Sequence, residues 1–391
     1  MRINRESVRG PLDLRVIHLP LNVGNNVYPL SLGLRRIGIK SDCLVLAPHS
    51  FGYPYDFDLS NGGRRGKFLI EVARIHWLLR IIKNYNTIHF NFGSTLAARV
   101  GPNVEWSISK KILHFPYVWY LNLFQITELW IYKVRRIRMF VHYQGDDARQ
   151  GAAMQGLKYS LLQGATEGYY SEKTDKFKSK QIRRIGAYAE KIYYVNPDLG
   201  ALLPIQAQFI PYSHIDIQEY EFSPHSPSSS VVKIVHAPSN RGIKGTKFVV
   251  DTLERLTITN PNIQFELIEN LPHELALKKY READLVIDQM LGGWYGGLAV
   301  EALALGVPVM CYLREEDFKN LNQEMLRELP IINVTTQNLE ERILEFITFS
   351  DSDISDLRKR CRAFVEKWHN VDSICNRISA DYLKAHETKK S

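Results

Sequence analysis

Residues 231–246 read VVKIVHAPSNRGIKGT. The first seven form a short apolar run rich in β-branched side chains, which predicts a buried strand. The loop that follows contains Pro238, Gly242 and Gly245, and it leads into a predicted helix that extends to Leu256. A strand, a loop and a helix in this order are typical of a βαβ unit in a parallel sheet.

The same alternation recurs on both sides of this stretch. Short apolar runs predict further strands at residues 14–19, 40–47, 87–92, 139–143, 191–195, 208–211, 265–269, 285–288, 307–312 and 331–334. Helical patterns lie between them, including one with apolar Leu30 and Leu34 that ends at Gly38. The sequence therefore predicts an α/β protein with two Rossmann-like βαβ domains in tandem, facing each other across a cleft.

A Pro- and Ser-rich segment at residues 223–230, SPHSPSSS, separates the two series of strands. We therefore expect a first domain over residues 1–222, a linker over 223–230 and a second domain over 231–352. The remaining residues, 353–391, have a helical pattern. This tail is long enough to pack back across the first domain, and we expect it to lie there.

The composition is that of a globular protein, because 391 residues with 45% apolar side chains suffice for substantial cores. It excludes a disulfide-rich miniprotein, a collagen-like fibre and a wholly disordered chain. The cysteines are far apart and have no CxxC spacing, so neither a zinc ribbon nor a disulfide framework is expected. Sparse thiols and the lack of a signal-peptide pattern predict a cytoplasmic location.

The net charge of +8 is unevenly distributed. Residues 1–210 have 29 Lys and Arg against 15 Asp and Glu, whereas residues 211–391 have 21 against 27. A basic first half suits anionic lipid, phosphorylated substrates or nucleic acid. Because the sequence has no RNA-recognition or helix-turn-helix signature, we do not expect nucleic acid as a partner.

The most membrane-like segment, residues 112–132, is interrupted by Pro116 and by three polar residues, so it does not predict a bilayer span. Its aromatic side chains precede a basic cluster at residues 133–138. Aromatic and basic residues together can hold a protein at a membrane surface, here the inner face of the membrane. A core helix with a basic end fits the same pattern, and both interpretations stay open.

Polar groups follow the predicted strands where ligands of open α/β sheets bind, beyond the carboxyl ends of the strands. Arg241 and Lys244 lie in such a loop, at a predicted helix N-terminus. Two cations beside unpaired backbone N–H groups can hold a diphosphate. A solvated basic turn would have the same sequence.

A second loop, the glycine-rich residues 292–297, leads into an apolar helix over 298–305 that contains Glu301. An ionised carboxylate in an apolar helix needs partners, and the two hydroxyls of a ribose would supply them. The alternative is that Glu301 complements the helix dipole from the N-terminal turn.

A third loop follows the strand at residues 139–143 and reads VHYQGDDAR over 141–149. Alternation along the strand places His142 and Gln144 on one face. Together with Asp147 and Arg149 they form a candidate site, although a structural histidine would also fit. The motifs of serine hydrolases, zinc metalloproteases and dinucleotide dehydrogenases are absent from the sequence, and no metal site is expected.

These segments resemble GT-B glycosyltransferases, particularly glycosyltransferase family 4. The similar segments are IVHAPSNR at 234–241 with Lys244-Gly245-Thr246, ADLVID at 283–288, Gly296, VEALALGVPV at 300–309, YQGDDAR at 143–149 and VNPDL at 195–199. The resemblance implies a donor site mainly in the second domain. It also implies transfer of a sugar from a nucleotide-diphosphate sugar with retention of configuration, and no metal or other cofactor.

The resemblance also assigns roles to individual residues. Arg241 and Lys244 would neutralise the leaving diphosphate, Glu301 would hold the ribose, and Gly24 would give the phosphates a backbone contact. The candidate donor-binding residues are Gly24, Asn25, Asn240, Asp288, Gly296, Gly297 and Glu301. The candidate catalytic residues are Arg241, Lys244, His142 and Gln144, and Asp147 and Arg149 are further site candidates. The expected acceptor is a glycan or a lipid-linked glycan in polysaccharide or glycoconjugate synthesis.

The sequence departs from the family pattern at two positions. Where the family has a carboxylate that engages the donor sugar, this sequence has Gly293, and Asp288 is the nearby candidate to replace it. Where the family has a sugar-contacting histidine, it has Gln144, two residues after His142. A nucleotide-sugar epimerase of the same fold and a pseudo-transferase that binds nucleotide or glycan are therefore alternatives.

Overall fold

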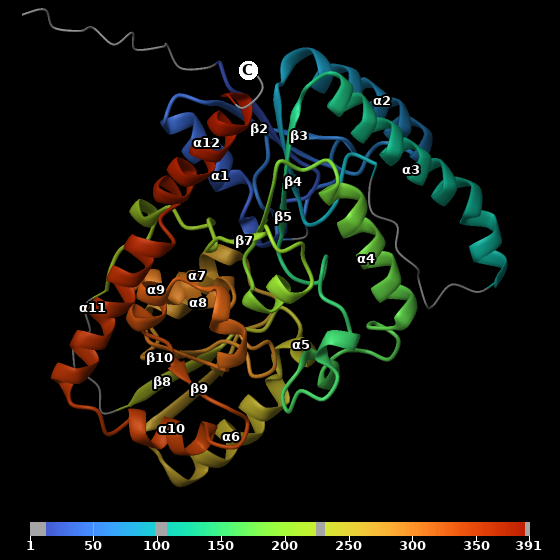
Figure 1. Ribbon diagram of the computed structural model, residues 1–391. Coiled ribbons are helices and arrows are strands. Elements are labelled where there is room, and N and C mark those ends of the chain that lie inside the picture. The colour runs from blue at the N-terminus through green and yellow to red at the C-terminus, as the bar shows by residue number, and fades with distance from the viewer. Residues whose placement is uncertain (1–12, 50, 98–107, 224–230, 388–391) are drawn as a thin grey trace, which may run out of the picture.

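Two parallel sheets organise the chain in the computed structural model, which describes residues 13–49, 51–97, 108–223 and 231–387 (Figure 1). The first sheet has the strand order β3-β2-β1-β4-β5-β6-β7, and the second has the order β12-β11-β10-β8-β9. Helices cover both faces of each sheet. The predicted α/β class with two Rossmann-like domains is confirmed.

The strands of the first sheet are short, and most of their residues are buried. They are β1 (Arg15–Leu19), β2 (Lys40–Val45), β3 (Phe57–Asp58), β4 (Thr87–Asn91), β5 (Arg138–Tyr143), β6 (Lys191–Tyr194) and β7 (Gln208–Phe209). The second sheet consists of β8 (Val232–His236), β9 (Ile263–Leu267), β10 (Leu285–Ile287), β11 (Val309–Cys311) and β12 (Ile332–Asn333). Every residue of β4 and β5 is buried, as expected for central strands with both faces covered.

The helices that connect the strands vary widely in length. In the first domain they are α1 (Tyr28–Arg36), α2 (Lys67–Asn84), α3 (Ile108–Val134) and α4 (Glu172–Gly186), with short 3-10 helices η1 (Val23–Asn25), η2 (Ala152–Met154), η3 (Leu161–Gln163), η4 (Pro197–Ala201) and η5 (Ile217–Glu219). The second domain has α5 (Arg241–Lys244), α6 (Thr246–Thr259), α7 (His273–Arg281), α8 (Gly297–Ala304), η6 (Glu315–Asn320), α9 (Gln323–Glu328) and α10 (Leu339–Phe346).

The C-terminal segment forms two helices, α11 (Asp351–Trp368) and α12 (Val371–Glu387), where the sequence showed one helical pattern. The chain bends between them at His369, whose ring is buried and bonded to the Tyr295 hydroxyl and the Tyr212 carbonyl. α12 then lies along α1 of the first domain (Figure 1). The packing is close, because the Cys375 thiol donates to the Leu30 carbonyl at 3.4 Å.

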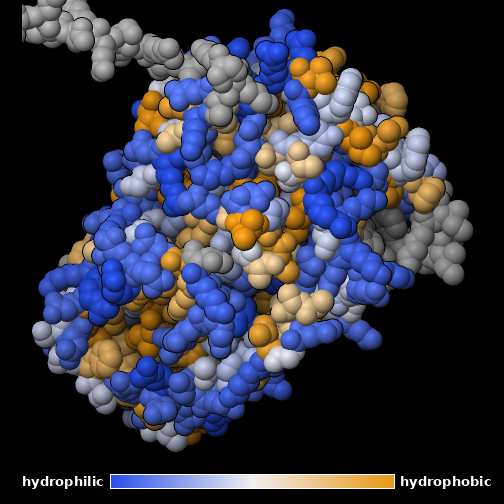
Figure 2. Space-filling view, viewed as in Figure 1, coloured by the Kyte–Doolittle hydropathy of each residue, from blue (hydrophilic) through white to orange (hydrophobic). Residues whose placement is uncertain are grey.

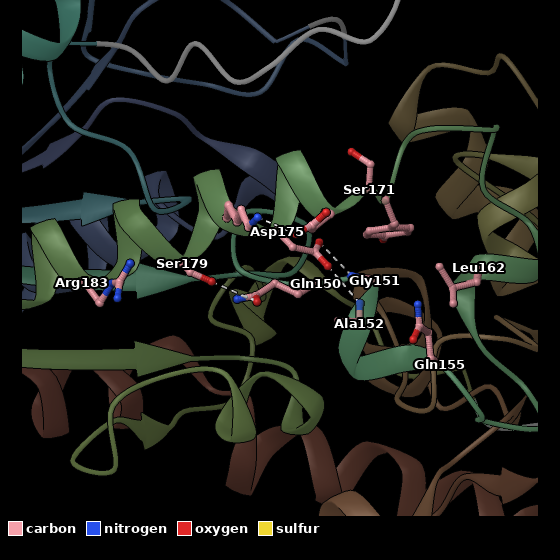
Figure 3. Close-up of a pocket in the computed structure, with 12 residues that line it drawn as sticks. Gln150, Gly151, Ala152, Gln155, Leu162, Ser171, Asp175, Ser179 and Arg183 are labelled. Atoms are coloured by element: carbon pink, nitrogen blue, oxygen red, sulfur yellow. Dashed lines mark hydrogen bonds and ion pairs between the residues drawn. The ribbon is translucent and has the colours of Figure 1, made fainter.

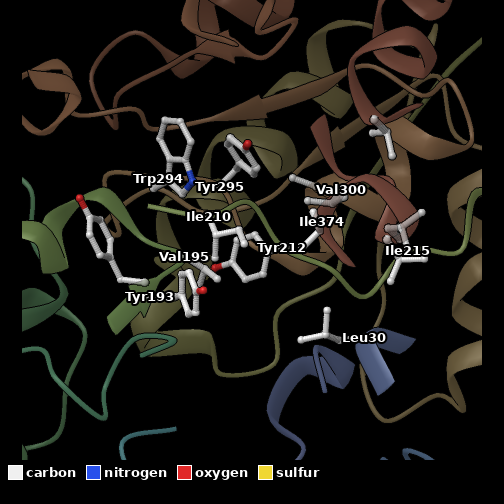
Figure 4. Close-up of a cluster of buried hydrophobic side chains, with 14 of the residues drawn as sticks. Leu30, Tyr193, Val195, Ile210, Tyr212, Ile215, Trp294, Tyr295, Val300 and Ile374 are labelled. Carbon is white, nitrogen blue, oxygen red and sulfur yellow. The ribbon is translucent and has the colours of Figure 1, made fainter. Parts of the chain in front are cut away.

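Apolar side chains join the two domains into one continuous core (Figure 4). Ile210 and Tyr212, which follow β7, lie beside Trp294 and Tyr295 from the loop before α8. Trp294 meets Phe209 edge-on at 6.0 Å between ring centroids. The two sheets are thus held together by buried aromatic contacts as well as by the connecting chain. Part of the predicted linker, residues 224–230, lies outside the described residues.

α2 and α3 lie side by side on the first sheet, and the Tyr117 hydroxyl donates to the Glu71 carboxylate at 2.8 Å (Figure 1). The inner face of α3, including Leu121, Leu129 and Tyr132, is buried. Its opposite face is exposed and also apolar, so both interpretations of residues 112–132 fit part of this helix. Among the helices in the described ranges, none has the length and apolar character that a bilayer span requires.

Candidate functional site

A cavity of about 250 Å³ lies between the two domains, at the carboxyl ends of β1, β8 and β9. The first domain contributes Gly24 and the aromatic residues Phe51 and Tyr53. The second domain contributes the loop after β8, the segment from the end of β9 into α7, and the first residues of α8. Four residues singled out in the sequence line this cavity: Gly24, Lys244, Gly297 and Glu301. We refer to it as the cleft pocket.

The loop after β8 reaches the cleft pocket through a single helical turn. Asn240 caps α5, because its side-chain oxygen accepts from the Ile243 N–H at 3.0 Å. α5 ends at Gly245, whose φ of +70° separates it from α6. The predicted loop therefore contains a short helix, α5, and the predicted helix follows it as α6. The break turns Lys244 toward the cleft pocket.

The two cations of this loop have different surroundings. The Lys244 ammonium donates to Asp288 at 2.8 Å, and Asp288 is fully buried and also accepts from the Gly296 N–H at 2.5 Å. Arg241 is 63% exposed and forms a two-pronged ion pair with Glu269. Lys244 and Glu269 line the cleft pocket, whereas Arg241 lies at its rim behind Glu269. Each cation therefore has a carboxylate partner already.

Glu301 is the carboxylate of α8 that faces the cleft pocket. Its Oε1 lies 2.8 Å from Nε2 of His273 and 3.9 Å from Nε2 of His214. Glu301 is the fifth residue of α8 and lies in its second turn, so the predicted alternative of a first-turn dipole contact does not fit its position. The Glu301 carboxylate thus has one imidazole within hydrogen-bond distance and a second one nearby. Its other lone pairs can accept hydrogen bonds from polar groups of a ligand.

The two histidines differ because their exposure differs. The hydrogen bond to Glu301 raises the pKa of His273, whose side chain is 41% exposed. Burial lowers the pKa of His214, whose Nε2 bonds to the Gly297 carbonyl at 3.3 Å. Burial beside Glu301 also raises the pKa of the Tyr53 hydroxyl to about 12. At neutral pH, His214 and Tyr53 are therefore uncharged hydrogen-bonding groups.

The remaining predicted donor residues lie close to the cleft pocket without lining it. Asn25 is in a left-handed conformation and its side chain accepts from Asn22 at 3.1 Å. Asn240 is committed to its cap. Asp288 and Gly296 bond to each other behind Lys244, where a Cβ on Gly296 would meet the Lys244 nitrogen at 2.9 Å. Their roles toward a ligand stay predictions.

The predicted residues of the 141–149 stretch lie in the first domain, outside the cleft pocket. His142 is buried in a stack of imidazoles, 5.7 Å from the His89 ring centroid. The Asp147 carboxylate accepts from the backbone N–H groups of Gln144 and Gly145 and so closes the turn after β5. Arg149 is buried in ion pairs with Asp146 and Asp198. The Gln144 side chain is buried, and neither of its amide atoms has a hydrogen-bond partner in the described part of the chain.

Gly293, where the sequence differs from the family pattern, lies directly against the side chain of Arg314. Gly293 has a φ of +75°, and a Cβ there would meet the Arg314 side chain at 3.0–3.1 Å. Arg314 is buried, its Nε donates to Asp317 at 2.7 Å and its backbone N–H donates to the Gly293 carbonyl. A guanidinium thus occupies the space into which a side chain at residue 293 would extend.

A loop of the first domain crosses the cleft beside the cleft pocket. η3 packs on α5, and a Cβ on Gly164 would lie 1.8 Å from the Gly242 carbonyl oxygen. Met154, Tyr159 and Leu161 form a small apolar cluster with Leu291 of the second domain. This backbone contact between two glycines holds the domains in the arrangement seen in Figure 1.

We expect Gly164→Ala to open this crossing. A methyl group at a close-packed contact costs about 1–3 kcal/mol, which shifts the balance between closed and open domains by a factor of about 5 to about 150. Small-angle X-ray scattering should show a larger radius of gyration than for the wild type. Gly66→Ala is the matched control, because a Cβ there meets open space. An unchanged radius for Gly164→Ala would show that the crossing does not fix the domain arrangement.

A second, larger cavity of about 380 Å³ lies wholly in the first domain, between η2 and the start of α4 (Figure 3). Asp175 closes its floor by accepting from the N–H groups of Gly151 and Ala152, both at 2.9 Å. Ser179 and Gln150 are paired at 3.0 Å. Because most of its polar groups are paired within the chain and none comes from the second domain, we regard the cleft pocket as the functional site.

The cleft pocket is also lined by four residues that were not among the predicted site residues: His214, His273, Tyr53 and Ser239. A signal existed for His273, because it starts a helix just beyond the carboxyl end of a predicted strand. No local signal existed for Tyr53 or His214, which reach the cleft pocket only through the packing of the two domains.

Comparison with known proteins defines the fold. No protein-family model and no curated protein matches the sequence. Among solved structures, sucrose-phosphate synthase from Thermosynechococcus elongatus superposes with a TM-score of 0.60 at 14% identity, over 96% of this chain and 100% of that chain. UDP-GlcNAc 2-epimerase from Neisseria meningitidis, bound to UDP-GlcNAc, superposes with a TM-score of 0.50 at 14% identity, over 95% and 100%. Likeness at these identities shows the fold, and the chain has the two-domain GT-B fold.

Proposed function

We propose that this protein is a glycosyltransferase that moves a sugar from a nucleotide-diphosphate sugar to a glycan or a lipid-linked glycan. The observation that carries the proposal is the cleft pocket, where Lys244, Glu301 and the backbone of Gly24 face one cavity from both domains. Its position between the two domains and its mixed polar and aromatic lining suit a nucleotide. By the resemblance to family 4, transfer proceeds with retention of configuration.

Each group has a defined task in this proposal. Glu301 accepts hydrogen bonds from the ribose hydroxyls and exchanges its bond to His273 for them. Breaking the bond between sugar and diphosphate places negative charge on the diphosphate. A fixed cation such as Lys244 stabilises that charge in the transition state. Arg241, at the rim, adds a second cation once the diphosphate competes with Glu269 for it.

A thermal-shift titration with UDP, GDP, ADP and CMP tests the proposal. A ligand that binds only the folded state stabilises it by about 2.7 kcal/mol at a hundredfold excess over its dissociation constant. We expect one nucleotide to raise the melting temperature of the wild type and not that of Glu301→Ala. Glu254→Ala, which removes an exposed carboxylate of α6, is the matched control and should respond like the wild type. No shift with any nucleotide would count against a donor site.

Two other functions have an observation in their favour. An epimerase has the same fold, as the N. meningitidis structure illustrates. A pseudo-transferase is favoured by Arg314, which fills the space beside Gly293. Incubation with a nucleotide-sugar, with and without an acceptor, distinguishes the transferase, the epimerase and the pseudo-transferase. A new nucleotide-sugar without acceptor indicates the epimerase, transfer that requires an acceptor indicates the transferase, and binding without turnover indicates the pseudo-transferase.

A further inference from the structure

The outer surface of α2 and α3 is unusually apolar for a surface that is exposed in the described part of the chain. Of the 22 large apolar side chains that are exposed in the described residues, 12 belong to these two helices. On α3 the exposed set is Phe115, Trp119, Leu123, Ile126, Trp130 and Val134, each between 46% and 67% exposed. On α2 it includes Phe68, Val72, Ile75 and Leu79, between 48% and 78% exposed. Figure 2 shows apolar side chains of the α2–α3 layer at the upper right of the molecule, with hydrophilic side chains between them.

The spacing shows that each set is one continuous stripe. Steps of three or four residues separate the members on both helices, so they lie on one helix face. The stripe on α3 extends over 20 residues, from Phe115 to Val134, and is about 28 Å long at a rise of 1.5 Å per residue. Each helix therefore has two apolar faces, one on the sheet and one toward solvent. Contiguous exposed apolar surface of this extent indicates a binding surface.

Among the described residues, the exposed charges on the two helices and at their ends are positive. Exposed cations flank the stripes at Arg64 before α2, at Lys67 and Lys83 on α2, at Lys133 in the last turn of α3 and at Arg135 just after it. The acidic residues of the two helices are turned inward. Glu71 bonds to Arg74 and Tyr117, and Glu128 is fully buried and accepts from the Ala97 N–H at 3.0 Å. The surface is thus apolar at its centre and basic at its ends.

We infer that the α2–α3 stripes form a docking surface for an anionic membrane, with both helices lying flat in the interface. Apolar side chains insert between the acyl chains, tryptophans such as Trp119 and Trp130 lie at the headgroup level, and the flanking cations attract anionic headgroups. A second copy of this chain fits less well, because a symmetric contact would bring the basic ends together. The inference rests in part on the proposed function: a transferase that docks on the membrane through α2 and α3 is placed next to a lipid-linked acceptor.

Flotation of the full chain with lipid vesicles, without nucleotide, tests the inference. We expect binding to phosphatidylcholine vesicles that contain about one third phosphatidylglycerol, and at least about tenfold weaker binding to pure phosphatidylcholine. The variant Trp119→Gln/Trp130→Gln should bind the anionic vesicles at least about tenfold more weakly. Ile205→Gln/Ile258→Gln, which removes two exposed isoleucines elsewhere, should bind like the wild type.

The role of the basic residues is tested with two double variants that reverse the same number of charges. Lys133→Glu/Arg135→Glu should weaken binding, and Lys247→Glu/Arg327→Glu, with the same charge change on exposed residues of the second domain, should weaken it much less. Thermal melting of each variant checks its folding. Absence of vesicle binding by the wild type, or equal binding by the tryptophan variant, would overturn the inference. So would a dimer in light scattering that the tryptophan variant abolishes while the wild type fails to float. Because this assay contains no nucleotide, its failure leaves the thermal-shift test of the donor site intact.

Discussion

Lys244→Ala is expected to lower the free energy of unfolding by about 3–5 kcal/mol, because it leaves a buried carboxylate without its cation. Asp288 is fully buried, and the Lys244 ammonium at 2.8 Å is its charged partner. Its other hydrogen bond, from the Gly296 N–H, cannot compensate a whole charge in this environment. Urea denaturation of the wild type and the variant measures the difference.

Two further variants make this result specific to the buried pair. Adding Asp288→Asn to Lys244→Ala should recover much of the loss, because the amide oxygen still accepts from Gly296 and no charge remains. Lys279→Ala breaks the ion pair with Glu266, in which both side chains are more than 40% exposed, and should change stability by at most about 1 kcal/mol. If Lys244→Ala were no more destabilising than Lys279→Ala, the buried pair of Lys244 and Asp288 would not stabilise the fold as expected.

Acidification is the second change with a large expected effect, because it protonates buried imidazoles. His18, His142 and His369 are fully buried, and burial lowers the pKa of each to about 3. In the unfolded chain a histidine has a pKa of about 6.5, so between these values the unfolded state binds more protons. Stability is therefore complete above about pH 6.5 and decreases as the pH falls toward 3.

Between its pKa in the folded chain and its pKa in the unfolded chain, each histidine changes the free energy of unfolding by about 1.4 kcal/mol per pH unit. At about pH 5 the three histidines together cost up to about 6 kcal/mol, against a total stability of about 5–15 kcal/mol. The urea midpoint should therefore fall steeply between about pH 6.5 and 5 and change little between about pH 7 and 8. A midpoint that is constant down to about pH 5 would contradict this account.

A histidine variant tests whether the buried imidazoles are responsible. His18 stacks on His89 at 5.1 Å, and neither of its ring nitrogens has a hydrogen-bond partner among the described residues. Besides burial, His142 and Arg35 lower its pKa through their charges. His18→Leu should remove the contribution of His18 to the acid dependence, about 2 kcal/mol at about pH 5. The exposed His76→Leu is the control and should leave the dependence unchanged.

Much of the fold could be predicted because its signals are local. The alternation of short apolar runs with helical patterns predicted every described strand of both parallel sheets except the two-residue edge strand β3, and the predicted strands begin and end within a few residues of their observed positions. Two features depended on conformation that the pattern does not encode. The left-handed Gly245 ends a short helix, α5, inside the stretch expected to be a loop, and the bend at His369 divides the C-terminal helix.

The candidate site was predicted only in part, for a physical reason. Lys244, Gly297 and Glu301 follow strands of one sheet, whose carboxyl ends necessarily meet at one edge. His214 and Tyr53 come from the segment between the domains and from the first domain, and they reach the cleft pocket through tertiary packing. The same distinction applies to α3, where the inner and outer apolar faces can be separated only once the sheet beneath it is known.

The central claim is that the cleft pocket binds the nucleoside diphosphate of a sugar donor. A crystal structure of the chain with the nucleotide that gives the largest thermal shift tests this claim most directly. We expect the ribose hydroxyls to donate hydrogen bonds to the Glu301 carboxylate in place of its bond to His273. We also expect the diphosphate to contact Lys244 and the Gly24 backbone. A nucleotide bound outside the cleft pocket, or Glu301 still bonded to His273 with the nucleotide present, would contradict it.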